Sequence, residues 1–187
     1  TGTDGANTEY FNAGLNSTVL EGAQLSGGSR AVELGLITHK GTLSLARKML
    51  LGALLVTALL LYNSFLITGE IANAQNALIL GVVGGLLGYF YTARPIRLVS
   101  RRGLGEIAIF LAFGPILTLG ALFAISSNTV ELFSTEFYNA IYLGIPFGFL
   151  TTNILYINQY PDTVSDASTG KNHLIVTLGK KNARWGY

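Results

Sequence analysis

Cysteine is absent from the 187 residues of this chain, and charged side chains are scarce. Without cysteine, the chain has neither disulfide bonds nor thiolate metal ligands. Only 12% of its residues are Asp, Glu, Lys or Arg, whereas soluble domains carry about 25%. The net charge of +2 is too small to favour nucleic acid as a partner. These shortages argue against a soluble protein and favour a membrane protein.

Long apolar segments make up much of the remainder, since 50% of the residues are hydrophobic. A bilayer core requires roughly 20 mostly apolar residues per helix. Four segments meet this requirement, at residues 44–67, 76–92, 104–126 and 137–157. We therefore predict an all-α fold, a polytopic membrane helical bundle with about four transmembrane helices in a single membrane domain.

The charged residues divide the connections between these spans into two kinds. Lys and Arg lie in residues 1–43, in the loop after the second span and in residues 158–187. The other two connections carry no Lys or Arg, only Glu70, Glu131 and Glu136. Because basic loops stay cytoplasmic, we place both ends of the chain on the cytoplasmic face of a cell membrane. The chain starts at Thr1 rather than Met, so we expect it to be an internal portion of a longer protein, truncated at both ends.

Glycine and proline are distributed unevenly among the spans. Pro115 and Pro146 lie inside the third and fourth spans, where they should kink the helix and free a backbone carbonyl. Glycines at G-x-x-x-G spacing let helices approach closely, which favours packing over function for the second span. The glycines in that span are Gly81, Gly84, Gly85 and Gly88.

The most informative polar residues follow the fourth span, in residues 158–187, where we expect a loop and then the start of a further helix. Asn158, Asp162 and Asp166 stand four residues apart, a spacing that brings them near one face of a helix. Clustered carboxylates repel each other and are costly beside hydrocarbon, and a divalent cation offsets both costs. Mg²⁺ is commonly held by one or two carboxylates together with substrate phosphates. The alternative is an ordinary solvated loop, with Pro161 ending the span.

Four arginines between residues 94 and 102 form the second candidate feature. Their simplest role is to anchor a loop to anionic lipid. Guanidinium groups also bind phosphate oxygens in a bidentate manner, so these arginines suit a diphosphate site as well. The sequence alone does not show which of them face such a site.

Further polar residues lie near the ends of the spans, and each has more than one interpretation. Tyr91 is either an aromatic residue of the membrane interface or a hydrogen-bond donor to a leaving diphosphate. Glu106 pairs with an arginine, favours a helix N-terminus or binds substrate. Asn153 lines a site or bonds to a neighbouring helix. His39 and His173 are too isolated in the sequence to suggest metal ligands.

The N-terminal segment is polar and rich in glycine, and Arg30 follows Gly27, Gly28 and Ser29. It is either a flexible linker or an ordered loop. In an ordered loop, the glycines would let backbone amides approach an anion, and Arg30 would supply a guanidinium to phosphate.

Taken in order, these segments resemble the UbiA-type membrane prenyltransferases. The run 158–179 resembles the second aspartate-rich motif of that family, most closely that of the naphthoate prenyltransferases of menaquinone synthesis. Residues 2–5 resemble the end of the first aspartate-rich motif, and residues 26–30 resemble the loop that follows it. Residues 91–98, 102–106 and 113–115 resemble the segment across the third cytoplasmic loop.

The resemblance implies a bundle of about nine spans in the complete protein, with both aspartate motifs at the cytoplasmic mouth of a central cavity. It implies transfer of a polyprenyl group from a polyprenyl diphosphate to an aromatic acceptor, with Mg²⁺ as cofactor and the lipid bilayer as surroundings. Departure of the diphosphate would leave an allylic carbocation that the acceptor ring attacks. The leading acceptor is 1,4-dihydroxy-2-naphthoate.

The resemblance also assigns roles to individual residues. Asp162, Asp166 and Asp4 would be catalytic and would bind the metal together with Asn158. The diphosphate would contact Lys171, Arg30, Arg94, Arg97 and Tyr91, and the remaining substrate-binding residues would be Asn153 and Glu106.

The chain departs from the family pattern in three places. The start of the first motif is missing, so we expect the chain alone to be inactive. Pro95 stands where many relatives have a lysine, and Gln159 stands where some have an acid or a second asparagine. Other acceptors therefore stay open: 4-hydroxybenzoate, chlorophyllide, homogentisate or a glyceryl ether lipid. A non-catalytic membrane scaffold or transporter is the remaining alternative.

Overall fold

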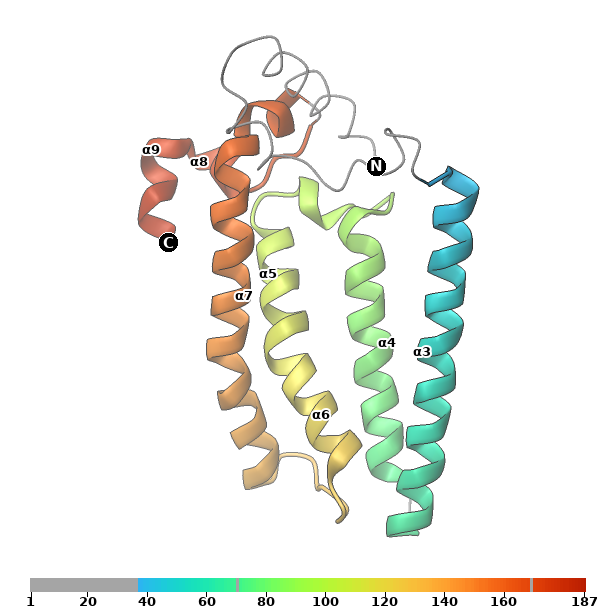
Figure 1. Cartoon of the computed structure of the whole chain (residues 1–187). Helices are drawn as coiled ribbons and strands as arrows, with labels where there is room; N and C mark the ends of the chain where they lie inside the picture. Colours follow the sequence, from blue (N-terminus) through green and yellow to red (C-terminus); the bar gives the residue numbers. More distant parts are fainter. Residues whose placement is uncertain (1–36, 70, 169) are drawn as a thin grey trace. The chain divides into compact units, whose positions relative to one another are not determined.

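The structure, a computed structural model, describes residues 37–69, 71–168 and 170–187, and every regular element in these ranges is a helix. The all-α prediction is therefore confirmed. These residues divide into two compact units, which are taken separately below. One unit contains residues 37–88 and 110–149, with residue 70 not described, and the other contains residues 89–109 and 150–187, with residue 169 not described. Figure 1 labels the helices along the chain.

Among the described residues, four helical segments are long and apolar enough to cross a membrane. They lie in α3 (His39–Thr68), in α4 (Ala72–Thr92), in α5 (Leu104–Leu111) with η2 (Ala112–Ile116) and α6 (Leu117–Ile125), and in α7 (Thr135–Ser168). The predicted number of spans is confirmed, and the chain has the character of a multi-pass membrane protein. The leaflet that each loop faces stays a prediction.

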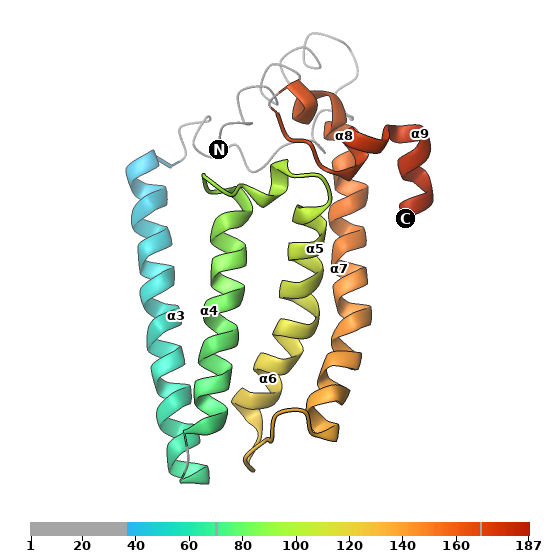
Figure 2. The ribbon, with the colours of Figure 1, turned by 180° about the vertical axis from the view of Figure 1, so that it is seen from behind.

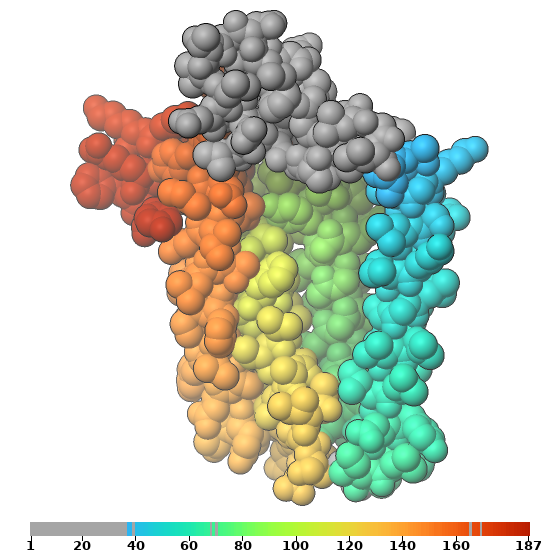
Figure 3. Space-filling view, viewed as in Figure 1, coloured from blue at the N-terminus to red at the C-terminus, as the bar shows by residue number. Residues whose placement is uncertain are grey.

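Helix α3 shows why the chain requires lipid or further helices around it. It begins at Thr38, whose hydroxyl accepts a hydrogen bond from the Gly41 amide, and it ends at Gly69 in the left-handed conformation. Its leucines are mostly exposed, and Figure 3 shows one side of α3 uncovered along its length. Helices α3 and α4 run side by side in both views (Figures 1 and 2). An apolar face of this extent is typical of a surface that meets hydrocarbon.

Glycines outside the second span allow a close helix approach in the first unit. A Cβ added to Gly114 would lie 2.7 Å from the carbonyl oxygen of Gly144. A Cβ added to Gly148 would lie 2.7 Å from the carbonyl oxygen of Phe110. Among the described atoms, nothing lies within 4 Å of a Cβ built at Gly81, Gly85 or Gly88, and Gly84 meets only one side chain, at 3.7 Å. Within the described part of the chain, the glycines of the second span therefore make no close helix packing of the kind that their spacing predicted.

The predicted kink is present at Pro115. The π-helical turn η2 contains Gly114 with φ −103° and ψ −110°, which is not a helical conformation. The Thr118 hydroxyl donates to the carbonyls of Gly114 and Pro115, at 3.2 Å each, and so bonds to carbonyls beside the kink. Helix α7, by contrast, continues without interruption through Pro146.

The second unit contains the loop after α4, with the 3₁₀ turn η1 (Leu98–Ser100), most of α5 and the C-terminal part of α7. It also contains α8 (Leu174–Leu178), α9 (Lys180–Ala183) and the 3₁₀ turn η3 (Arg184–Gly186). Tyr156, Ile175 and Ala183 form its buried apolar cluster. The Tyr156 hydroxyl donates to the Ala183 carbonyl at 2.8 Å, which fixes α9 to α7.

One predicted boundary needs correction. The loop that we expected from residue 158 is helical through Ser168, because α7 continues past Pro161. Proline removes one backbone hydrogen bond but does not have to end a helix. The Thr163 hydroxyl donates to the carbonyls of Gln159 and Tyr160, at 3.1 and 2.8 Å, beside the proline. Asn158, Asp162 and Asp166 therefore lie on the helix itself.

Candidate functional site

The C-terminal end of α7 carries the predicted carboxylates on one helical face. Asn158 is exposed, Asp162 is half-buried and Asp166 is buried, so the three side chains progress from open to enclosed surroundings along the helix. Their spacing of four residues keeps them near one side of α7, as the sequence predicted.

The chain turns back on Asp166 immediately after α7. Gly170 adopts a left-handed backbone with φ 71°, which glycine accepts without steric cost. The Lys171 amide donates to the Asp166 carbonyl at 2.9 Å, closing the turn. The Lys171 ammonium then lies 2.9 Å from Oδ1 of the same aspartate. The turn at Gly170 therefore brings Lys171 back to Asp166.

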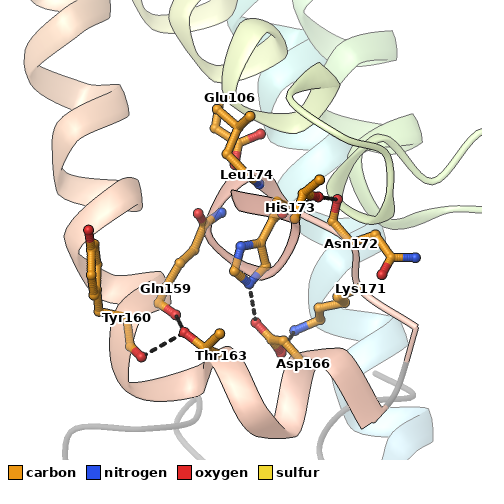
Figure 4. A network of polar contacts seen from close by, with 10 residues as sticks. Glu106, Gln159, Tyr160, Thr163, Asp166, Lys171, Asn172, His173 and Leu174 are labelled. Carbon is orange, nitrogen blue, oxygen red and sulfur yellow. Dashed lines mark hydrogen bonds and ion pairs between the residues drawn. The ribbon is translucent and has the colours of Figure 1, made fainter. Parts of the chain in front are cut away.

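His173 completes the surroundings of Asp166. Its side chain is 1% exposed, and its Nε2 lies 3.3 Å from the second carboxylate oxygen, Oδ2 (Figure 4). Burial alone raises the pKa of Asp166, but the neighbouring His173 and Lys171 outweigh burial and hold that pKa below the ordinary value for aspartate. Asp166 is therefore an anion at neutral pH, which is the form that binds metal.

Glu106 holds the segment that carries His173. It is buried, and its Oε1 accepts a hydrogen bond from the Leu174 amide at 3.1 Å (Figure 4). Gly105, beside it, lets the preceding turn pack closely, since a Cβ there would lie 3.2 Å from the Val99 Cα. Glu106 thus joins the start of α5 to the start of α8 within this unit.

The arginine loop separates into residues that line the site and residues that support it. Arg94 and Arg97 line the same pocket as Asp162 and Asp166. Arg97 has a left-handed backbone with φ 45°, a conformation that is uncommon for a residue with a side chain. Arg101 instead donates to the Ile96 carbonyl at 2.6 Å, so it holds the loop in shape.

These residues surround one pocket of about 710 Å³. Its lining includes two carboxylates, Asp162 and Asp166, and three cations, Arg94, Arg97 and Lys171. Tyr91, Val99 and Leu155 supply less polar walls. The complete lining is Tyr91, Thr92, Ala93, Arg94, Arg97, Val99, Leu155, Asn158, Gln159, Asp162, Asp166, Lys171 and His173.

The structure brings together most of the predicted site residues, but not all of them. Asn158, Asp162, Asp166, Lys171, Arg94, Arg97 and Tyr91 all line the pocket. Neither Asn153, which is half-buried on α7, nor Glu106 is part of this lining. Asp4 and Arg30 lie outside the described residues.

The donor set around the pocket suits Mg²⁺ only in part. Within residues 37–187, as far as they are described, no three His, Asp or Glu side chains are arranged to hold a metal ion. Asp162 and Asp166, with the Asn158 amide beside them, provide the one or two carboxylates by which Mg²⁺ is usually held. Magnesium keeps several waters and takes its other ligands from substrate phosphates, so these residues fit that ion with a diphosphate bound.

Two buried polar residues of the lining, His173 and Gln159, were not recognised as site residues from the sequence. His173 seemed isolated because its partner, Asp166, lies on the other side of the Gly170 turn. Gln159 stood out only as a departure from the family pattern, although it lies three residues before Asp162 on the same helix. This helical spacing from Asp162 is the sequence signal by which Gln159 could have been found.

Comparisons with known proteins agree with this arrangement. Residues 39–187 match the model of the UbiA prenyltransferase family. The chain is 33% identical over 115 residues to a UbiA prenyltransferase domain-containing protein 1 from Dictyostelium discoideum, covering 60% of this chain and 32% of that protein. It is 28% identical over 157 residues to the 1,4-dihydroxy-2-naphthoate octaprenyltransferase of Escherichia coli, covering 83% of this chain and 47% of that protein.

A third relative is the 2-carboxy-1,4-naphthoquinone phytyltransferase of Synechocystis, 31% identical over 130 residues, with 65% of this chain and 40% of that protein covered. The chain thus spans less than half the length of each of these three relatives. No solved structure matches it significantly. Because the family model covers most of its length, the chain belongs to the UbiA prenyltransferase family.

Proposed function

We propose that the protein transfers a polyprenyl group from a polyprenyl diphosphate to an aromatic acceptor. The observation that carries this proposal is the pocket beside α7, where two carboxylates and three cations meet at the end of a membrane-spanning helix. Two of the relatives named above are naphthoate or naphthoquinone prenyl- or phytyltransferases. We therefore propose 1,4-dihydroxy-2-naphthoate, in menaquinone biosynthesis, as the acceptor.

The charges of the pocket lining support a diphosphate accompanied by a metal ion. Arg94, Arg97 and Lys171 exceed the two aspartates by one positive charge. A diphosphate carries more negative charge than one Mg²⁺ cancels, so the pair together balances this excess. A diphosphate without a metal ion would instead face Asp162 and Asp166 as like charges.

Asp162 and Asp166, with the Asn158 amide, would hold Mg²⁺ beside the diphosphate. When bound, the ion supplies positive charge that stabilises the leaving diphosphate. His173 and Lys171 orient the Asp166 carboxylate, and the two arginines bind the phosphate oxygens that face the loop. These side chains are positioned before the reaction begins, which is the condition for electrostatic stabilisation of a developing charge.

The reaction then requires only substrate bonds to change. The allylic C–O bond breaks, and its electron pair leaves with the diphosphate. The electron-rich ring forms a C–C bond to the allylic carbon, and with a naphthoate acceptor the ring carboxylate departs as carbon dioxide. Apolar walls such as Leu155 and Val99 limit the access of water to the carbocation. We place this site on the cytoplasmic face of the cell membrane, following the distribution of basic loops.

The test uses the full-length protein in detergent with polyprenyl diphosphates, Mg²⁺ and a panel of aromatic acceptors, with product detected by mass spectrometry. We expect prenylated naphthoquinol as the main product. Asp162→Ala and Asp166→Ala should each abolish turnover while the protein still inserts into the membrane. Normal turnover in either variant would remove that residue from the metal site, and transfer to no acceptor would refute the proposed function.

A further inference from the structure

Gln159 carries a buried side-chain oxygen that has no hydrogen-bond partner among the described residues. The residue is 7% exposed and belongs to the pocket lining. Among the described residues, no donor reaches its side-chain oxygen. Its backbone carbonyl is engaged, since it accepts from the Thr163 hydroxyl at 3.1 Å. Buried amides nearly always have partners, because removal from water is costly for an unpaired polar group. The missing partner is therefore expected from a ligand.

The position of Gln159 along α7 indicates which part of a ligand it meets. It lies three residues before Asp162 and seven before Asp166, both helical spacings that keep it on the same side of α7. At 1.5 Å per residue, Gln159 is about 4.5 Å from Asp162 and about 10 Å from Asp166 along the helix axis. One turn before Gln159, on the side away from the aspartates, is Leu155, an apolar lining residue. Gln159 thus lies between the charged end of the pocket and its apolar wall.

Figure 4 shows the Gln159 side chain extending from α7 toward the segment that carries His173. The neighbouring Asn158 is exposed, whereas Gln159 is buried. Tyr160 has a buried hydroxyl without a partner among the described residues, but it is not part of the pocket lining. Gln159 is thus the candidate among these three neighbours for a buried polar contact with a ligand.

The chemistry of the substrates of the proposed reaction selects the group that meets Gln159. Diphosphate oxygens accept hydrogen bonds only and belong at the charged end, near Lys171 and the arginines. The polyprenyl chain has no polar atom. A ring hydroxyl both donates and accepts, so it satisfies whichever atom of the amide faces it. The attacking ring must lie about 3–3.5 Å from the allylic carbon, hence next to the diphosphate. That position is within reach of the helical turn that lies between Leu155 and Asp162.

We propose that the Gln159 amide recognises the aromatic acceptor through a hydrogen bond to a ring hydroxyl, and that Gln159 thereby determines which acceptors are used. This inference rests on the proposed prenyl transfer and adds the acceptor subsite to it. A site built to pair with a hydroxyl rejects analogues that lack it, because the amide is then left unpaired in a buried place. Gln159 is a specificity-determining residue, and no proton leaves the hydroxyl in this step.

The test compares two ligands that differ only in the hydroxyl, 4-hydroxy-2-naphthoate and 2-naphthoate. The 4-hydroxyl is distant from the carboxylate and is therefore free to bond to the protein. Both are fluorescent, so their binding to the full-length protein is titrated directly, without turnover. The variant Gln159→Met removes the amide with little change in side-chain volume. We expect the preference for the hydroxylated ligand to fall by about tenfold in Gln159→Met. Dividing the ligand preference of the wild-type protein by that of the variant cancels effects of the hydroxyl that do not involve Gln159.

Kinetics give a second measurement. In Gln159→Met, the KM for 1,4-dihydroxy-2-naphthoate should rise by about tenfold, while the KM for the polyprenyl diphosphate stays unchanged. Gln75→Met, the same substitution at an exposed glutamine of α4, is the matched control and should alter neither ratio nor KM. If Gln159→Met does not fold, Gln159→Leu replaces it in both measurements.

An unchanged preference in a folded Gln159 variant would overturn the inference, and so would a rise in the KM for the diphosphate substrate alone. These outcomes are separable from failure of the proposed function. If the wild-type protein transfers prenyl groups but the variant keeps the ligand preference, only the role of Gln159 is wrong. If the wild-type protein transfers none to any acceptor, the proposed function fails and the role of Gln159 fails with it.

Discussion

Replacing His173 tests whether Asp166 is held in place for metal binding. His173 is almost completely buried, and its Nε2 lies 3.3 Å from Oδ2 of Asp166, while Lys171 is 2.9 Å from Oδ1. In His173→Ala, the carboxylate loses the partner at Oδ2, keeps Lys171 at Oδ1 and gains freedom to rotate. A contact to a charged group contributes about 1.5–3 kcal/mol. When the free energy of Mg²⁺ binding falls by this amount, the affinity for Mg²⁺ drops by about tenfold to a hundredfold. This is the usual range for residues that orient metal ligands.

The assay measures the Mg²⁺ concentration that gives half-maximal prenyl transfer by the full-length protein. Thermal unfolding with and without Mg²⁺ provides a second readout that does not depend on turnover. His173→Gln retains a side-chain donor and should recover much of the Mg²⁺ affinity lost in His173→Ala. Asn172→Ala, an exposed neighbour, is the control for damage to the loop.

A purely structural role for His173 would give a different pattern. It would lower the unfolding temperature of His173→Ala equally with and without Mg²⁺ and leave the half-maximal Mg²⁺ concentration unchanged. That outcome would refute the idea that His173 orients a metal ligand.

Three further predictions concern other parts of the molecule. Replacing Arg94 or Arg97 with alanine should raise the KM for the polyprenyl diphosphate more than that for the acceptor, and equal effects in steady-state kinetics would indicate general damage instead. Gly144→Ala should lower thermal stability in detergent, because its Cβ would lie 2.7 Å from the Pro115 backbone nitrogen. Gly85→Ala, where no described atom lies within 4 Å of the Cβ, should be neutral or slightly stabilising. Equal melting temperatures of the two variants would contradict this packing. Tyr156→Phe removes the 2.8 Å hydrogen bond to the Ala183 carbonyl, a bond that contributes about 1 kcal/mol. The variant should therefore show faster amide hydrogen exchange in α9. Unchanged exchange would show that apolar contacts alone hold that helix.

The sequence was most informative about features that depend on long, continuous patterns. Four spans were predictable because each apolar run is long enough to cross a bilayer. The face shared by Asn158, Asp162 and Asp166 followed from helical spacing alone. The end of α7 did not, because Asn158 and Pro161 have the local character of a helix end, while the helix continues to Ser168.

Contacts between distant residues were not predictable in the same way. The G-x-x-x-G spacing in the second span predicted close packing there, but among the residues that the structure describes the close approach involves Gly114, Gly144 and Gly148. Which glycines face a neighbouring helix depends on how the helices are rotated, and that information is absent from the spacing. His173 was missed because it meets Asp166 only after the chain reverses at Gly170.

The sequence left open which arginines face the site. Arg94, Arg97 and Arg101 have the same charge and lie in one loop, so composition does not separate them. Their roles depend on the course of the backbone: Arg97 lines the pocket from a left-handed conformation, and Arg101 bonds to the Ile96 carbonyl.

The most direct test of the central claim is Mg²⁺-dependent binding of an allylic diphosphate by the pocket at the end of α7. The measurement titrates geranylgeranyl thiodiphosphate, which reacts too slowly to turn over, into the full-length protein in nanodiscs, with Mg²⁺ and with a chelator. Binding should require Mg²⁺ and should be lost in Asp162→Asn, which removes the charge and keeps the shape. Equal affinity with and without Mg²⁺, or undiminished affinity in Asp162→Asn, would contradict the account.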